Sequence, residues 1–261
     1  MNGCIIQARM GSTRLPGKAM KKLNDKIPML KFQLSQLKLS KNIDRIIIAT
    51  TTKENDNLIV DFCKQNNLEY FRGSSSDVLD RYYQCAKKSK FSIIVRITSD
   101  NPLIDPEIVD NVISEYLNSD CDYISTEQPT QTYPLGFAVE IFNFESLEKT
   151  WKEAKLPSER EHVTPYIYKN IDLFKQKTHS YHQNFSHLRC TVDTDEDFQL
   201  VENIIEKINK RPIQLIDVLE LFEKEPSLFK INNHIKHDGY EKSLKEDKDF
   251  LKTISNDEKN N

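Results

Sequence analysis

The sequence predicts an α/β fold in which a mostly parallel sheet lies between two layers of helices, with a less regular second half. Three observations indicate this fold. Short apolar runs at 3–8, 45–50 and 92–98 are typical of buried strands. Amphipathic stretches separate them, and this alternation implies right-handed crossovers over a parallel sheet. The 261 residues, of which 38% are hydrophobic, suffice for one large domain.

The first half of the chain repeats a strand–helix unit. Strands are predicted at 3–8, 45–50, 69–73, 92–98 and 122–125. Helices are predicted at 27–39, 55–67, 76–90 and 105–117. Asp77 and Asp105 stand where helix caps are favoured, and Pro106 suits the first position of a helix. This half is expected to be Rossmann-like, with ligands bound beyond the carboxyl ends of its strands.

The regular alternation stops after residue 126. A polar loop at 127–135 precedes a predicted strand at 136–142 and a helix at 144–154. The next predicted segments are a loop and helix at 158–167, strands at 174–182 and 188–192, a helix to about 209 and a helix at 214–223. Lys, Asp, Glu and Asn dominate the end of the chain. A domain at 1–232 is therefore expected to be followed by a charged, mobile tail at 233–261.

Charge and cysteine content argue against several classes of protein. The 37 basic and 40 acidic residues give a net charge of −3, so no overall field favours nucleic acid or a membrane surface. The five cysteines are scattered and form no C-x-x-C pair, which is typical of buried, reduced thiols. The sequence shows no signal peptide and no apolar run of about 18 residues. We expect a cytoplasmic protein with neither a nucleic-acid nor a membrane partner.

The most informative stretch is the loop after the first predicted strand. It carries two glycines, two hydroxyls and three cations: Gly11, Gly17, Ser12, Thr13, Arg9, Arg14 and Lys18. Glycines let the backbone approach a ligand, and Arg and Lys bind phosphate oxygens, so the loop suits a triphosphate. The alternative is a polar connection with solvated cations. Ala19 after Lys18 excludes a P-loop, and G-x-G-x-x-G is also absent from the sequence.

Two acidic residues follow predicted strands, as a metal site for phosphoryl chemistry would require. Asp100 comes after 92–98 and Asp193 after 188–192. Magnesium takes oxygen ligands and usually one or two protein carboxylates. The alternative is structural, because Asp is also common in turns and at helix caps. Asp195, Glu196 and Asp197 are better explained as charges that favour a helix N-terminus.

These residues carry a resemblance to a known family. Q-A-R-M-G-S-T-R-L-P-G-K at 7–18 resembles the signature loop of the nucleotidyltransferases related to CMP-KDO synthetase, closest to the spore-coat polysaccharide cytidylyltransferase branch. R-I-T-S-D-N-P-L-I-D at 96–105 and T-V-D-T-D-E-D-F at 191–198 resemble the family's two metal-binding segments. The chain departs from the family at Ser99, where Gly is usual, and at Asn101, where Cys or Glu is frequent. The resemblance covers about 3–230 and implies the three-layer α/β/α nucleotidyltransferase fold.

The resemblance also implies a nucleotide site for CTP, with Mg²⁺ held by Asp100 and Asp193. The implied catalytic residues are Arg14, Lys18, Asp100 and Asp193. The implied nucleotide-binding residues are Ala8, Arg9, Met10, Gly11, Ser12, Arg14, Lys18, Arg72, Arg81, Thr98 and Ser99. Thr50 and Thr51 are further candidates, because their hydroxyls stand at the end of the second strand and suit a base edge or a ribose. For Thr50 and Thr51 a capped helix start is the alternative, since they follow the second strand beside Asp56.

An acceptor site is implied by two further segments, Y-P-L-G-F-A-V-E at 133–140 and R-E-H-V-T-P-Y at 160–166. The candidate residues are Tyr133, Gly136, Glu140, Glu161 and His162. His162 suits a general base or an acceptor ligand, and equally a structural or dimer contact. The family commonly dimerises through this irregular half, so a homodimer is expected.

The hypothesis from the sequence is a cytidylyltransferase that moves CMP from CTP to a small-molecule acceptor and releases pyrophosphate. An acidic sugar is the expected acceptor, and a phosphonate, a phosphorylated polyol or an amino-acid derivative are alternatives. Two other classes stay open. A nucleotide-sugar-dependent glycosyltransferase would use a D-x-D pair, which 193–195 matches in sequence. A non-catalytic nucleotide-binding protein would have Asp100 or Asp193 out of position.

Overall fold

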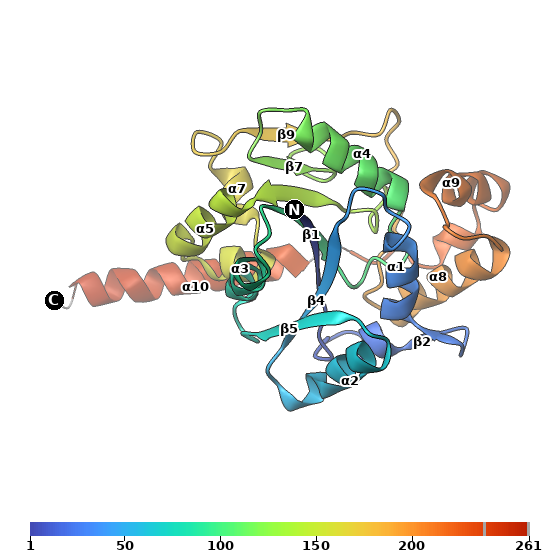
Figure 1. Cartoon of the computed structure of the whole chain (residues 1–261), viewed down its shortest axis with the longest axis horizontal. Helices are drawn as coiled ribbons and strands as arrows, with labels where there is room; N and C mark the ends of the chain where they lie inside the picture. Colours follow the sequence, from blue (N-terminus) through green and yellow to red (C-terminus); the bar gives the residue numbers. More distant parts are fainter. Residues whose placement is uncertain (237–238, 260–261) are drawn as a thin grey trace.

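The structure, a computed structural model, describes residues 1–236 and 239–259, with side chains as far as residue 254 (Figure 1). The described residues form a seven-stranded sheet in the order β5-β4-β1-β6-β8-β7-β9. The strands are β1 (Asn2–Gln7), β4 (Arg45–Thr51), β5 (Glu69–Gly73), β6 (Ile93–Thr98), β7 (Tyr123–Ser125), β8 (Glu140–Asn143) and β9 (Gln176–Thr178). A short hairpin of β2 (Lys22–Leu23) and β3 (Ile27–Pro28) lies apart from it. The first four strands of the order are parallel.

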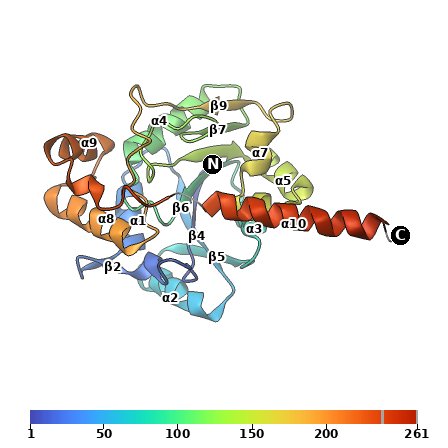
Figure 2. The same ribbon diagram turned by 180° about the vertical axis from the view of Figure 1, so that it is seen from behind.

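Helices cover both faces of this sheet, which confirms the predicted three-layer α/β fold. Side chains alternate along a strand, so Ile6 of β1 joins one core and Ile5 joins the other. The first core receives α1 (Met29–Leu37), α2 (Asn57–Gln65), α4 (Pro106–Leu117), α8 (Asp195–Lys207) and α9 (Leu215–Lys224). The second core receives α3 (Val78–Ser89), α5 (Phe144–Glu153) and α7 (Pro165–Lys169). Figure 2 shows α8 and α9 on the far side from α5 and α7.

Two of the predicted helix starts, those of α3 and α4, are confirmed by their caps. Asp77 accepts a hydrogen bond from the Asp80 backbone N–H at 2.8 Å and begins α3. Asp105 does the same for Glu107 at 2.8 Å, and Pro106 is the first residue of α4. Each cap satisfies a backbone donor that a helix leaves open in its first turn.

The irregular half departs from the sequence prediction at the sheet. β8 runs antiparallel between β6 and β7, so the strand predicted at 122–125 does not pair with β6. The strand predicted at 136–142 begins only at Glu140, because the backbone at Gly136 turns with φ +109°. A Cβ there would come within 2.6 Å of the backbone of Cys190. Only glycine fits this approach.

The prediction of a strand at 188–192 was wrong. Within the described chain these residues make only an isolated bridge between Leu135 and Arg189. They gain backbone partners from two loops instead of a sheet. Cys190 donates to the Leu135 carbonyl at 2.7 Å, and Val192 donates to the Asp100 carbonyl at 2.8 Å. The second of these bonds places Asp193 beside Asp100.

The segment predicted as one helix at 158–167 forms two, α6 (Pro157–His162) and α7. They are separated by Val163, whose φ of 73° and ψ of −54° lie outside helical space. Thr164 donates to the His162 carbonyl at 2.9 Å, which makes this a γ-turn. The predicted edge strand at 174–182 is shortened to β9.

The end of the chain is helical: α10 spans Gly239–Lys259, where the composition predicts a mobile tail. In Figure 1 it lies against the α3 and α5 side of the body, and its last turns extend beyond it. Ser243 and Asp247 are buried there, which explains why a charged segment packs. The predicted tail positions 237–238 and 260–261 lie outside the described residues, and the domain boundary at 232 stays a prediction.

None of the described helices has the length and apolarity needed to span a membrane. All five cysteines are free thiols, and four of them are buried. Burial raises the pKa of Cys63, Cys85 and Cys190 to about 12, so these thiols stay protonated and unreactive. The predicted buried, reduced cysteines are confirmed at those positions.

Candidate active site

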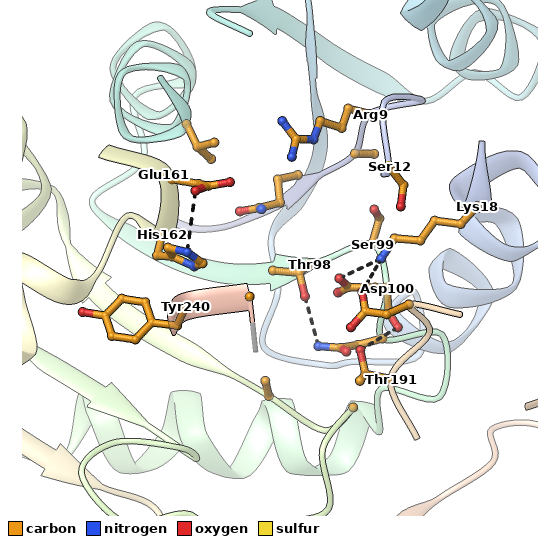
Figure 3. A pocket seen from close by; sticks show the side chains of 18 of the residues that line it. Arg9, Ser12, Lys18, Thr98, Ser99, Asp100, Glu161, His162, Thr191 and Tyr240 are labelled. Atoms are coloured by element: carbon orange, nitrogen blue, oxygen red, sulfur yellow. Dashed lines mark hydrogen bonds and ion pairs between the residues drawn. The ribbon is translucent and has the colours of Figure 1, made fainter. Parts of the chain in front are cut away.

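A pocket of about 340 Å³ lies at the carboxyl ends of β1 and β6. Gln7 and Thr98 are paired residues of these parallel strands, so the loops that follow them leave the sheet side by side. The loop after β1, the end of β6, the last turn of α6 and the first turn of α10 all contribute to its wall (Figure 3). This is the edge at which an open α/β sheet binds ligands.

Hydrogen bonds fix the conformation of the loop after β1. The Met10 backbone N–H donates to Asp56 Oδ1 at 2.6 Å, and Asp56 also accepts a hydrogen bond from the Thr51 hydroxyl. Gly17 adopts a φ of +73° and donates to the Met10 carbonyl at 2.9 Å. Thr51 and Asp56 therefore support the loop from inside the protein.

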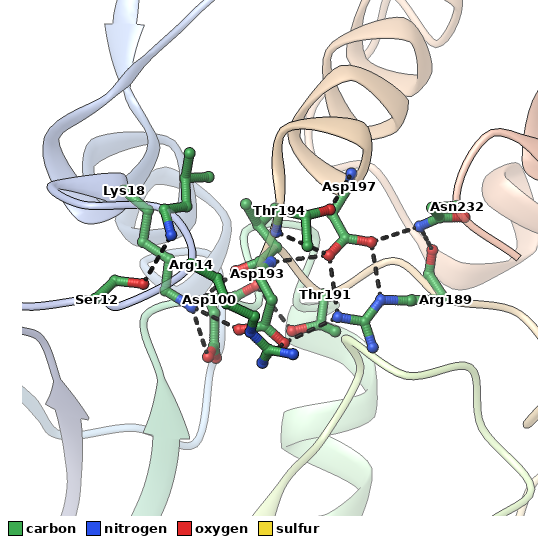
Figure 4. A network of polar contacts seen from close by, with 12 residues as sticks. Ser12, Arg14, Lys18, Asp100, Arg189, Thr191, Asp193, Thr194, Asp197 and Asn232 are labelled. Carbon is green, nitrogen blue, oxygen red and sulfur yellow. Dashed lines mark hydrogen bonds and ion pairs between the residues drawn. The ribbon is translucent and has the colours of Figure 1, made fainter. Parts of the chain in front are cut away.

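Two carboxylates converge on one cation in the pocket (Figure 4). Lys18 Nζ lies 3.1 Å from Asp100 Oδ2 and 2.9 Å from Asp193 Oδ1, and it donates to the Val192 carbonyl at 2.8 Å. Arg14 Nη2 is 3.0 Å from the second oxygen of Asp193. Residues 175 positions apart in the sequence thus meet at one point.

The charges of this cluster stabilise one another. Burial lowers the pKa of Lys18, but the attraction of Asp100 and Asp193 outweighs burial and leaves that pKa raised. Burial would raise the pKa of Asp193, but Lys18, Arg14 and Arg189 together lower it to about 2. At neutral pH Lys18 is therefore positive and Asp193 negative.

A buried network stands behind Asp193. Arg189 donates to Asp193 Oδ2 at 2.9 Å and to both oxygens of Asp197, at 2.8 and 3.0 Å. Asn232 donates to Asp197 Oδ1 at 2.7 Å. Asp197 was predicted as a charge at a helix N-terminus, and it also forms the capping box with Thr194. The prediction missed Arg189, although an arginine in the apolar run 188–192 signals a buried partner.

The donor set of this cluster fits a magnesium ion. Asp100 and Asp193 present hard oxygen donors to one position, which a cationic nitrogen occupies in this structure. The described residues contain no group of three or more His, Cys, Asp or Glu that would form a metal cage. A site with two carboxylates that opens into a pocket suits the coordination of magnesium, which usually keeps water and phosphate oxygens among its ligands.

The structure brings most of the predicted site residues to one pocket. On its wall lie Ala8, Arg9, Ser12, Arg14, Lys18, Arg81, Thr98, Ser99, Asp100, Gly136, Glu161, His162 and Asp193. The remaining candidates lie outside the wall: Met10, Gly11, Thr50, Thr51, Arg72, Tyr133 and Glu140.

Three of the candidates outside the wall have structural contacts. Arg72 donates to the carbonyls of Thr51 and Lys53, each at 2.9 Å, and so fixes the loop between β4 and α2. Glu140 is buried and pairs with Arg96. It also accepts hydrogen bonds at 2.6 Å from the hydroxyls of Tyr123 and Thr164. Tyr133 is buried as well and stacks on the His179 ring.

The pocket residues that the sequence prediction missed include Arg96, Glu127 and Tyr240. Glu127 is half-buried. Burial and the negative charge of Glu140 raise its pKa to about 7, against the opposing attraction of Arg96. Nothing in the polar loop at 127–135 distinguishes this residue, because its environment comes from other segments.

The fold and the pocket together define a class of protein. A parallel sheet has a cation-bearing loop after its first strand and two converging carboxylates at the same edge, as nucleotidyltransferases do. The cytidylyltransferase structure from Leptospira borgpetersenii is similar to this one, with a TM-score of 0.85 and 35% identity. The match covers 90% of this chain and 99% of that one.

The family follows from the sequence. A family model described as cytidylyltransferase matches residues 3–248, and the chain belongs to that family. An uncharacterised protein of Methanocaldococcus jannaschii is 40% identical over 239 residues, which is 90% of this chain and 96% of that protein. The spore coat polysaccharide biosynthesis protein SpsF of Bacillus subtilis is 34% identical over 233 residues, with coverage of 85% and 94%. The resemblance found in the sequence is confirmed, and the chain is a CTP-using nucleotidyltransferase.

Proposed function

We propose that this enzyme transfers CMP from CTP to an acceptor in a magnesium-dependent reaction that releases pyrophosphate. The observation that carries the proposal is the convergence of Asp100 and Asp193 on Lys18, with Arg14 beside them. This cluster offers both signs of charge at one point, so it has carboxylates for a metal and cations for phosphate oxygens.

In the proposed reaction the oxygen of an acceptor hydroxyl forms a bond to the α-phosphorus of CTP and gives up its proton to water. The bond from that phosphorus to the bridging oxygen breaks, and pyrophosphate leaves with the bond electrons. Arg14 and Lys18 are placed to bind phosphate oxygens and to stabilise the charge that develops there. A magnesium ion held by Asp100 and Asp193 would neutralise further charge on the leaving group.

For the acceptor we propose an acidic sugar used in surface polysaccharide synthesis. The support is the relative SpsF, whose name places it in spore coat polysaccharide biosynthesis. Away from the Lys18 cluster, the pocket wall also carries Arg81, Arg96, Glu127, Glu161 and His162, so it offers partners for acidic groups and for hydroxyls. A phosphonate, a phosphorylated polyol or an amino-acid derivative remain alternative acceptors. A homodimer and a cytoplasmic location stay predictions.

The geometry disfavours the two other classes. The side chain of Asp195, the second acid of the D-T-D sequence, is 76% exposed and pairs with Lys21 at 2.5 Å, away from the pocket wall. A glycosyltransferase that used this pair would need both acids in the site. A non-catalytic binder is disfavoured because Asp100 and Asp193 meet at the same cation.

The test is a thermal-shift series with CTP, ATP, GTP and UTP, each with and without magnesium. A ligand that binds the native state raises the melting temperature by mass action. We expect the largest shift with CTP and an increase of that shift with magnesium. Pyrophosphate release with candidate acceptors then follows. Equal shifts for all four nucleotides, or none, would contradict the proposal.

A further inference from the structure

The C-terminal helix reaches the pocket. Gly239 and Tyr240, in the first turn of α10, belong to the pocket wall. The Tyr240 ring meets the His162 ring edge to face, with centroids 5.1 Å apart. Figure 3 shows Tyr240, His162 and Glu161 together, on the opposite side of the pocket from Lys18 and Asp100. This side is the acceptor half under the proposed function.

One hydroxyl of α10 connects both α6 residues of that half. Ser243 Oγ donates to Glu161 Oε2 at 2.6 Å and lies within hydrogen-bond distance of His162 Nε2, at 2.9 Å. Ser243 is buried, so water does not readily replace it. A carboxylate and an imidazole on adjacent residues therefore take their orientation from a residue 81 positions away.

A second contact fixes the other end of α6. Asp247 Oδ1 accepts from the Ser158 backbone N–H at 2.8 Å, and Asp247 Oδ2 accepts from the Ser158 hydroxyl at 2.6 Å. Both residues are buried. The backbone donor is one that the first turn of α6 leaves open, so α10 supplies its cap. α10 thus holds this six-residue helix at both ends.

The backbone after His162 needs such support. The γ-turn at Val163 places a β-branched residue at a φ of 73°. Conformations of this kind are strained and persist only where surrounding contacts enforce them. Val163 is fully buried, and the Thr164 hydroxyl is held by Glu140. Contacts from the sheet and from α10 therefore meet at the turn that aims His162.

We propose that α10 forms the specificity-determining wall of the acceptor half, with Ser243 as a positioning residue for Glu161 and His162. This inference rests on the proposed function. The residues of this wall suit a hydroxyl-rich acceptor. The Glu161 carboxylate and the His162 ring hydrogen-bond hydroxyls, and the Tyr240 ring packs against a less polar face. CTP binding belongs to the other half and does not depend on α10.

The test compares full-length Ser243→Ala with a matched control, Thr253→Ala. Thr253 is exposed on the same helix, and its hydroxyl donates to the Asp249 carbonyl. The acceptor probes are 3-deoxy-manno-octulosonate, 2-aminoethylphosphonate, glycerol 3-phosphate and phosphoserine. With any probe that is turned over, we expect Ser243→Ala to raise the acceptor KM about tenfold, because a hydrogen bond to a charged group is lost. The KM for CTP should stay as in the wild type, and the control should change neither value.

Hydrogen exchange provides a readout without an acceptor. The amide of Val163 donates to the Glu159 carbonyl at 3.1 Å within α6. We expect Ser243→Ala to speed exchange of α6 amides about tenfold while the loop after β1 keeps its CTP-dependent protection. An unchanged acceptor KM overturns the inference. If the wild type uses none of the probes, unchanged exchange in α6 overturns it instead. Failure of the wild type to bind CTP would count against the proposed function, which is a separate result.

Discussion

One side of the pocket is formed by segments at the ends of the parallel strands β1 and β6. Lys18 and Asp100 lie on the segments that follow these strands, and Asp193 lies on a segment bound to Asp100. Glu161 and His162 on the other side sit on a six-residue helix that α10 holds in place. The first side is rigid because paired strands and a buried arginine network position it. The second depends on contacts between remote, polar segments. Under the proposed function, the side with Lys18, Asp100 and Asp193 is a fixed phosphate side, and the side with Glu161 and His162 is an acceptor side that a few substitutions can alter.

The pKa values of two acids in the pocket, Asp193 and Glu127, are shifted in opposite directions. The pKa of Asp193 is lowered to about 2, because Lys18, Arg14 and Arg189 surround it. The pKa of Glu127 is raised to about 7, because burial and Glu140 outweigh Arg96. Cations thus compensate the negative charge of Asp193, whereas at Glu127 the attraction of Arg96 does not outweigh burial and repulsion. Substitutions of individual acids test this difference.

The largest effect is expected at the carboxylates of the phosphate side. Asp100→Asn and Asp193→Asn keep the side-chain size but remove the charge that a metal requires. We expect each to lower kcat by about a thousandfold, measured as pyrophosphate release. The matched control is Asp195→Asn, because that neighbouring acid is exposed and pairs with Lys21. Wild-type turnover in either variant would remove that residue from the metal site.

A smaller effect is expected from the cation between these acids. Lys18→Ala should raise the KM for CTP and lower kcat, each by about tenfold, because in the proposed reaction Lys18 binds phosphate oxygens in both the ground state and the transition state. Steady-state kinetics with varied CTP would measure both values. Lys21→Ala is the control from the same short segment, since Lys21 pairs with the exposed Asp195. If neither constant moves in Lys18→Ala, the loop does not bind the triphosphate.

The phosphate side was largely predictable from the sequence. Asp100 and the loop at 9–18 follow apolar runs, so the strand pattern places them at one edge of the sheet. Asp193 was also identified, although the strand assigned before it at 188–192 was wrong. Its position comes from the bond between Val192 and the Asp100 carbonyl, a contact that no local pattern encodes.

The acceptor side was less predictable, because its geometry arises from contacts between distant segments. Glu161 and His162 were found only through a motif, and a second motif selected Tyr133 and Glu140, which are buried away from the pocket wall. The composition of 233–261 predicted a tail. Composition does not show that Ser243 and Asp247 share one helix face and find polar partners on α6.

The free energy of unfolding at acidic pH tests whether cations stabilise the ionised form of Asp193 on the phosphate side. The pKa of Asp193 is lower in the folded state than the usual value of 3.8, so its ionised form stabilises the fold above about pH 4. That contribution, about 2 kcal/mol, should be lost as the pH falls from 4 to 2. Denaturant unfolding of the wild type and Asp193→Asn should differ by this amount at pH 7 and converge near pH 2. A constant difference would mean that Asp193 is not held by its cations.

The smallest effect, with the opposite sign, is expected at Glu127. Its folded pKa of about 7 lies above the usual 4.5, so the folded state binds more protons than the unfolded state between these values. Stability contributed by this group is therefore complete below pH 4.5 and falls as the pH rises to 7. The full shift from 4.5 to 7 corresponds to about 3 kcal/mol, but Glu127 is half-buried and solvent screens part of it. Glu127→Gln removes the charge and should therefore stabilise the protein at pH 8 by about 1 kcal/mol, with no gain at pH 4. Denaturant unfolding at the two pH values measures this. Destabilisation at pH 8 would mean that Glu127 has a cationic partner, and that the acceptor side is compensated like the phosphate side.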